Sequence, residues 1–310
     1  MNSRRSDPDH RPMRIWYSVA LMALMLFFGC TGSQNSETQF PFHQQTKYFN
    51  FHYQRNSVTV AETIRFSDEF VEIVKRDFFK ADHGHPIQVF ICQDEHEFDQ
   101  FLHHDLEISD PSDYGIYLFS RKLLATYEDS GLGTFTHETL HPLLEENMAT
   151  TPVWAIEGIP TFFEKFYGYW NGNKLVLYWG YQNPWRIRQL GPNLTRLNLK
   201  SIVSENGGSE QDESQLRMAS MFLWEQGKFR RLLRLVATND RQGYPTYFEA
   251  AMGMPLDKII PIWQGYLDSV NQHRAGVLSP PPSTVLGNEA DFNAFVKEYG
   301  IPTKQVRQLD

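Results

Sequence analysis

The sequence predicts an α+β fold: a mixed β-sheet with two helices, then two helices beside a cleft, then a mostly helical C-terminal part. Two observations predict it. Runs with the alternation typical of strands end by about residue 181, whereas apolar residues at helical spacing dominate residues 215–271. With 310 residues, of which 41% are hydrophobic, the chain is long enough to bury a large core.

The first 29 residues have the features of an export signal. Four arginines precede an apolar run over residues 15–28, which is shorter than the roughly 20 residues that span a membrane. Residues 26–30, LFFGC, resemble a bacterial lipobox, which would make Cys30 a lipidated first residue. An uncleaved anchor and cleavage by an ordinary signal peptidase are the alternatives. All three place the body outside the cytoplasm, with residues 30–47 as a polar tether.

The first part of the body alternates strands with helices. One helix is predicted over residues 60–79, and a second begins after Asp94, which can cap it because Glu97 follows three residues later. Strands are predicted at residues 49–53, 87–92, 114–118 and 123–127. The last two strands are close enough in sequence to form a hairpin.

Two helices follow these strands. They are predicted over residues 134–147 and 152–167, and Thr151 stands at the cap position of the second. Pro142 and Pro160 lie inside them, and an interior proline removes a backbone hydrogen bond and kinks a helix. We therefore expect both helices to form with a local bend.

The remainder of the chain is predicted to be mainly helical. A strand pair is expected around residues 171–181, and helices fill residues 215–271. Three consecutive prolines at residues 280–282 indicate a linker. The body is therefore placed at residues 48–275, and a proline-rich linker with a C-terminal tail at residues 276–310.

The pentapeptide His137-Glu138-Thr139-Leu140-His141 is the most informative stretch. Residues four apart share one face of a helix, so both imidazoles can bind one metal ion. Glu138 lies beside the first ligand, where its carboxylate can accept a proton from a metal-bound water that attacks a carbonyl. The alternative for the pentapeptide alone is two ordinary histidines on a helix.

The next helix offers a third ligand. A catalytic zinc ion needs three protein ligands and one open position. Glu157, in the sequence Trp154-Ala155-Ile156-Glu157-Gly158, would return beside the two histidines if the two helices are antiparallel. Gly158 would allow close helix packing, and Glu164 is a candidate to hydrogen-bond a metal ligand. The alternative for Glu157 is a carboxylate on a helix surface.

The order of strand, His-Glu-x-x-His helix and Trp-x-x-Glu-Gly helix resembles the gluzincin metallopeptidases, above all the bacterial peptidase-MA-like proteins. Weaker similarity covers about residues 48–267. The resemblance implies a zincin-like fold and a zinc-dependent peptide hydrolase. His137, His141 and Glu157 would be the Zn²⁺ ligands and Glu138 the general base. The strand at residues 123–127 would be the sheet edge along which an extended peptide pairs.

The sequence departs from that family at one functional position. Gluzincins usually place a Tyr or His downstream of the zinc helices to stabilise the oxyanion, but residues 201–243 contain neither. Arg217, Tyr244 and Tyr247 are the candidates to replace it. Loss of one such donor lowers the rate on the order of 10²–10³-fold.

The leading prediction is therefore an extracytoplasmic zinc-dependent metallopeptidase that is tethered to a membrane and acts on a peptide or protein. The runner-up is a membrane-tethered binding or scaffold protein on the same fold with weak or no catalysis. A zinc hydrolase of non-peptide substrates is the third possibility. The net charge of −8, without a Lys/Arg cluster after the first residues, argues against a nucleic-acid partner. The only other cysteine, Cys92, is expected to be a buried apolar residue.

Overall fold

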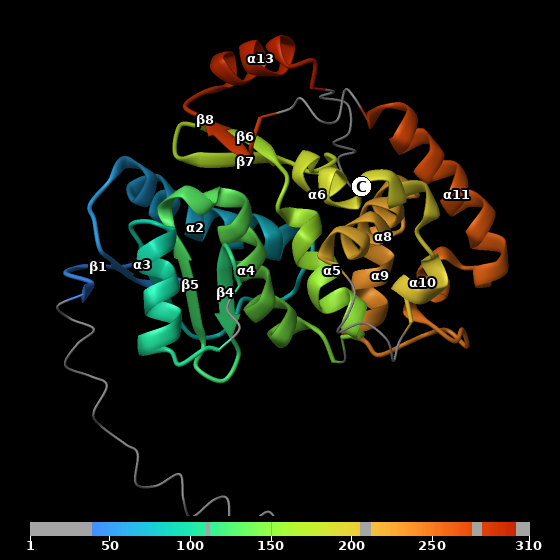
Figure 1. Ribbon diagram of the computed structural model, residues 1–310, viewed down its shortest axis with the longest axis horizontal. Coiled ribbons are helices and arrows are strands. Elements are labelled where there is room, and N and C mark those ends of the chain that lie inside the picture. Colours follow the sequence, from blue (N-terminus) through green and yellow to red (C-terminus); the bar gives the residue numbers. More distant parts are fainter. Residues whose placement is uncertain (1–38, 110–111, 150, 205–211, 275–280, 302–310) are drawn as a thin grey trace, which may run out of the picture. The chain divides into compact units, whose positions relative to one another are not determined.

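The computed structural model describes residues 39–109, 112–149, 151–204, 212–274 and 281–301 (Figure 1). The predicted export signal, Cys30 and the first half of the predicted tether lie outside the described residues. The features below belong to one compact unit, which begins at Phe40. Within the described ranges, no helix has both the length and the apolar character needed to cross a membrane.

A five-stranded mixed sheet forms the first half of this unit. Its strands are β1 (Phe42–Gln45), β2 (Phe49–Tyr53), β3 (Ile87–Cys92), β4 (Gly115–Leu118) and β5 (Leu123–Tyr127). Their order is β1-β2-β3-β5-β4, in which the three central strands are parallel and both edge strands are antiparallel to their neighbours. The predicted α+β class and mixed sheet are confirmed. β1 was predicted to be part of the tether, but its backbone pairs with β2 instead.

Helices cover both faces of this sheet. α2 (Val58–Asp77) and the apolar side chains of β2 belong to the main core, whereas α3 (Glu95–Gln100) and Cys92 belong to a second cluster on the opposite face. Asp94 caps α3 as predicted, because its side chain accepts a hydrogen bond from the Glu97 amide. The thiol of Cys92 is free and buried, as predicted.

The sheet edge is β4, not the strand at residues 123–127 that the family resemblance implied. β5 lies between β3 and β4 and is buried at all five positions. A tight turn that includes Lys122, with φ of 49°, joins β4 to β5, and β5 rather than β4 pairs with β3. An apolar strand such as β5 is stable when it is covered on both sides, which leaves the half-exposed β4 at the edge.

The two helices of the His-Glu pattern form side by side. α4 (Gly131–Asn147) begins three residues before the predicted start, and α5 (Val153–Phe163) ends four residues before its predicted end. Both contain their prolines as predicted. The predicted cap at Thr151 is wrong, because Pro152 occupies the N-cap position of α5 and no side chain caps it.

A small sheet closes the C-terminal side of α5. β6 (Tyr167–Asn171) pairs with β7 (Lys174–Tyr178) and with β8 (Thr284–Leu286), and α13 (Glu289–Glu298) packs on it. The strand pair therefore lies about three residues earlier than predicted, because Gly172 makes the turn with φ of 62°. Part of the predicted linker and tail thus belongs to the body, which extends past both predicted limits.

The remaining helices pack against α5. They are α6 (Pro184–Leu190), α7 (Leu199–Ile202), α8 (Glu213–Glu225), α9 (Phe229–Ala237), α10 (Tyr247–Met252) and α11 (Leu256–Gln272). Figure 1 shows α5 between α4 and α8. Gly158 permits this approach as predicted: a Cβ there would lie 3.3 Å from the Leu216 carbonyl oxygen, and Ser220 donates a hydrogen bond to the Gly158 carbonyl. α5, which carries Glu157, is therefore held between two helices.

Candidate metal centre

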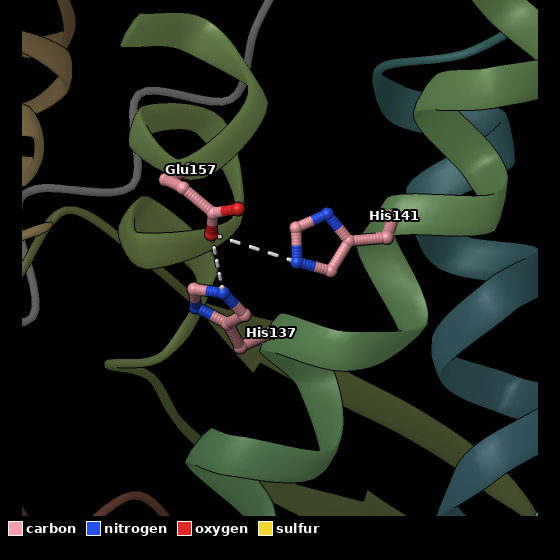
Figure 2. Close-up of side chains that lie close together, drawn as sticks. All are labelled: His137, His141 and Glu157. Atoms are coloured by element: carbon pink, nitrogen blue, oxygen red, sulfur yellow. Dashed lines mark hydrogen bonds and ion pairs between the residues drawn. The ribbon is translucent and has the colours of Figure 1, made fainter. Parts of the chain in front are cut away.

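α4 and α5 bring the three predicted ligands together. His137 and His141 lie one turn apart on α4, and Glu157 faces them from α5 (Figure 2). The Oε2 atom of Glu157 is 3.1 Å from Nε2 of His137 and 3.6 Å from Nε2 of His141. One ligand atom from each residue lies within 4.8 Å of the other two.

These separations fit a tetrahedral metal ion. Nitrogen and oxygen ligands lie about 2.0–2.2 Å from zinc, so two ligands of a tetrahedral site are roughly 3.3–3.5 Å apart. The distances from Glu157 to the two imidazoles, 3.1 and 3.6 Å, lie on either side of that value. Two imidazoles and one carboxylate are also a donor set that suits zinc and leaves a fourth position open. The residues present could therefore hold a metal ion close to their present positions.

Packing orients His141. Its ring stacks parallel to Tyr117 at 6.2 Å and meets Phe119 edge-on at 5.8 Å. Its Nδ1 atom is buried and has no hydrogen-bond partner among the described residues. Metal-binding histidines usually donate that N–H to a second group. The orientation of His141 thus depends on aromatic contacts with Tyr117 of β4 and with Phe119, which directly follows that strand.

A hydrogen-bond network orients His137. Its Nδ1 atom is 2.9 Å from Oε1 of Glu164, which was the predicted partner of a metal ligand. Glu164 also accepts hydrogen bonds from Asn183 at 3.0 Å and from Arg186, whose Nε and Nη2 atoms lie 3.1 and 2.5 Å from its two oxygens. Arg186 pairs in addition with Glu213.

Sequence reasoning did not find Asn183 and Arg186. Asn183 caps α6 through a hydrogen bond from the Trp185 amide, and Pro184 follows at the first helical position. This Asn-Pro pair is a helix-start signal that predicts α6 but says nothing of what α6 contacts. The contact with Glu164 depends on the fold.

The acid–base properties of the ligands reflect burial and close opposite charges. Burial opposes the charged form of His137, but hydrogen bonds to Glu157 and Glu164 raise its pKa well above the usual value. Burial raises the pKa of Glu157, but His137 and His141 lower it to about 2. Burial lowers the pKa of His141 to about 4. A divalent cation at this point would bind the Nε2 lone pair of His137, which a proton occupies when no metal is present.

Glu138 lies beside the candidate metal ligands. It is buried, and its Oε2 atom lies 3.8 Å from Nε2 of His141. Burial raises its pKa to about 8, more than the nearby charge of His137 lowers it, and the carboxylate of Glu157 raises it further. Gly115 at the start of β4 permits this arrangement, because a Cβ there would lie 3.1 Å from Cγ of Glu138. The edge strand therefore passes directly beside Glu138.

A second group of possible ligands, His137, Glu164 and Glu213, has a different role. The Nη2 atom of Arg186 hydrogen-bonds to both of its carboxylates, so a guanidinium already balances their charge. Of the two groups among the described residues, the one that includes Glu157 is therefore the better candidate for a metal ion.

The candidate metal centre borders a cavity of about 800 Å³ through His137 and Glu138, whereas His141 and Glu157 do not line it. The cavity is within the size range of ligand-binding clefts. Its walls come from the start of β4, the first turn of α4, α6 and residues 281–283, and His137 and Glu138 lie on its surface. Two of the residues that line the cavity, Tyr114 and Trp185, contact each other edge-on, with their ring centroids 5.5 Å apart. The predicted proline-rich linker therefore supplies one wall of the cleft.

The structure does not place the three candidate oxyanion donors at this cleft. Arg217 is 1% exposed and its Nη2 atom donates to the Tyr181 carbonyl at 2.7 Å. Tyr247 hydrogen-bonds to Asn239, and Tyr244 packs against the main core. Along α8, Glu213 reaches the cleft, and Arg217 lies one turn deeper. Among the described residues, Tyr114 is the tyrosine that lines the cleft.

Lys165, on the cleft wall, leads to a prediction on stability. Burial, followed by the charge of Arg217, lowers its pKa from 10.5 to about 7. Between these two pH values the unfolded chain binds the proton and the folded chain does not, so the contribution of Lys165 makes the protein more stable as the pH rises. Lys165→Met should reduce the slope of the unfolding free energy between pH 7 and 9 by about 1 kcal/mol per pH unit. Urea unfolding at several pH values measures it.

The matched control for this prediction is Lys174→Met, because Lys174 is exposed on β7. Its slope should equal that of the wild type. An unchanged slope in Lys165→Met would show that the Lys165 amine keeps its proton in the folded protein.

Comparison of the sequence with protein-family models and with curated proteins gave no match. The similarity to the peptidase-MA-like proteins therefore stays a prediction that rests mainly on residues 137–164. What the centre does is accordingly inferred from its geometry.

Proposed function

We propose that this protein is an extracytoplasmic zinc-dependent metallopeptidase on a zincin-like fold. The observation that carries the proposal is the convergence of His137, His141 and Glu157 on one point, with the buried carboxylate of Glu138 beside it. A bound zinc ion would lower the pKa of a coordinated water and polarise the substrate carbonyl. The predicted export signal and lipidation at Cys30 support the location and the membrane tether.

Glu138 would move the proton in this reaction. Its Oε2 atom accepts a proton from the attacking water, whose oxygen bonds to the carbonyl carbon. Glu138 then passes the proton to the leaving nitrogen as the C–N bond breaks. In the metal-free protein, burial holds the pKa of this carboxyl group at about 8. A bound cation would lower that pKa and favour the carboxylate form, which accepts the proton.

The substrate would be an extended peptide that lies along β4. This edge strand has one free side, and main-chain pairing with a sheet edge is a common way to bind peptides. The contact between Gly115 and Glu138 puts the free edge beside the general base. A peptide bond held on β4 is thus close to the groups that would cleave it.

The proposal is tested by the metal content of the chain from residue 31 onward, measured by mass spectrometry. We expect about one zinc per chain in the wild type, and loss of the metal in His141→Ala and Glu157→Ala, because two protein ligands hold zinc far more weakly than three. His104→Ala, which changes an exposed histidine on another element, should keep the metal. A wild type without zinc would refute the proposed centre.

One observation favours the second candidate, a membrane-tethered binding or scaffold protein with weak or no catalysis. None of Arg217, Tyr244 and Tyr247 lines the cleft, so the usual oxyanion donor has no counterpart among those three. A zinc-loaded protein that cleaves neither a peptide library nor a panel of amides and esters would support this candidate. Cleavage of the esters alone would support a hydrolase of non-peptide substrates.

A further inference from the structure

We propose that Arg186 is a positioning residue for the metal ligand His137 and that it acts through Glu164. The inference rests on the proposed metal centre. It assigns a role to α6, a short helix in which no metal-ligand or catalytic motif occurs. The chain between α6 and the ligand helix α4 includes α5 and the β6–β7 hairpin, so the link exists only in the folded protein.

The first step is the contact between Arg186 and Glu164. Both residues are buried, with 7% and 8% of their surface exposed. The Nε atom of Arg186 is 3.1 Å from one carboxylate oxygen and its Nη2 atom is 2.5 Å from the other. Such a two-point pair fixes the rotation of the carboxylate as well as its charge.

The second step is the contact between Glu164 and His137. The oxygen of Glu164 that accepts from Arg186 Nη2 is also the one that lies 2.9 Å from Nδ1 of His137. Because this oxygen is an acceptor, the imidazole proton belongs on Nδ1. The Nε2 atom of His137 then faces Glu157, 3.1 Å away, and would give its lone pair to a metal ion that replaces the proton between them.

The third step is that Arg186 itself is held in place. Its Nη2 atom also pairs with Glu213 from α8, and its guanidinium lies over the Trp185 ring at 4.3 Å. A planar guanidinium satisfies these contacts together, whereas a lysine ammonium is a point charge that cannot bind both oxygens of Glu164 in one plane. The position thus requires the shape of arginine and not only its charge.

The experiment compares zinc affinity in the wild type, Arg186→Lys and Arg186→Gln, by competition with a chromophoric chelator of known affinity. Removal of a group that orients a metal ligand weakens metal binding roughly 10–100-fold. We expect a loss of that size in Arg186→Gln and a loss of at least about 10-fold in Arg186→Lys. The control is Arg188→Gln, an exposed arginine on the same helix, which should bind zinc as the wild type does.

Two further readouts separate positioning from a general effect on folding. Circular dichroism reports whether each variant is folded, and the visible spectrum of the cobalt(II)-loaded protein reports the geometry of the ligands. A folded Arg186→Lys variant with weaker zinc binding and an altered cobalt spectrum is the expected result. Arg186→Gln leaves Glu164 buried without its cation, which can prevent folding. In that case the zinc affinity of Arg186→Lys tests the inference.

The outcomes separate this inference from the proposed function. If the wild type binds no zinc, the proposed metal centre is refuted and the role of Arg186 with it. If the wild type binds zinc and both Arg186 variants bind it within about twofold, the centre stands and the inference is overturned. Failure of Arg186→Lys to fold would also overturn it, because Arg186 would then be needed for the fold rather than for the orientation of His137.

Discussion

Glu138→Gln should lower the rate of peptide hydrolysis about 10²–10⁴-fold while the protein keeps its zinc. The amide has nearly the shape of the carboxylate, so the packing against Gly115 and the three ligands stays unchanged. It has no basic oxygen to accept the proton of the attacking water. Steady-state kinetics on a fluorogenic peptide, with the metal content of the same sample, measure both quantities.

The control is Glu146→Gln, which changes an exposed glutamate on the same helix. Its rate and metal content should equal those of the wild type. Hydrolysis that persists at the wild-type rate in Glu138→Gln would show that another group accepts the proton. Loss of zinc in Glu138→Gln would show instead that Glu138 contributes to metal binding.

Trp154→Ala should lower the free energy of unfolding by about 3–5 kcal/mol. Trp154 is fully buried on α5, and its ring meets Phe248 of α10 edge-on at 5.8 Å. Alanine leaves a cavity between α5 and the C-terminal helices, which cannot close because α8 already contacts α5 at Gly158. Urea unfolding of the metal-free protein measures the loss without a contribution from bound zinc.

Val153→Ala is the matched control for this prediction, since Val153 is the neighbouring residue on α5 and is 40% exposed. It should change the free energy of unfolding by less than about 0.5–1 kcal/mol. A loss in Trp154→Ala no greater than in Val153→Ala would mean that the helices repack around the smaller residue. Because Glu157 lies one turn further along α5, such repacking would also be visible as weaker zinc binding.

The sequence by itself determined the features that depend on neighbours along the chain. The strands β2, β3, β4 and β5 and the helices α2 and α3 followed from apolar spacing and from a cap at Asp94. The pairing of His137 with His141 followed from helix geometry, because residues four apart share a face in any α-helix. Glu157 followed once two antiparallel helices were assumed.

Only the tertiary structure decided the features that depend on residues far apart in sequence. It placed β4 rather than β5 at the sheet edge, brought β8 from the predicted tail onto β6, and put Arg217 one turn too deep to reach the cleft. It also joined Arg186 to Glu164. The physical reason is that burial and side-chain pairing across elements are set by how whole helices and strands pack, and local spacing carries no information on which element is the neighbour.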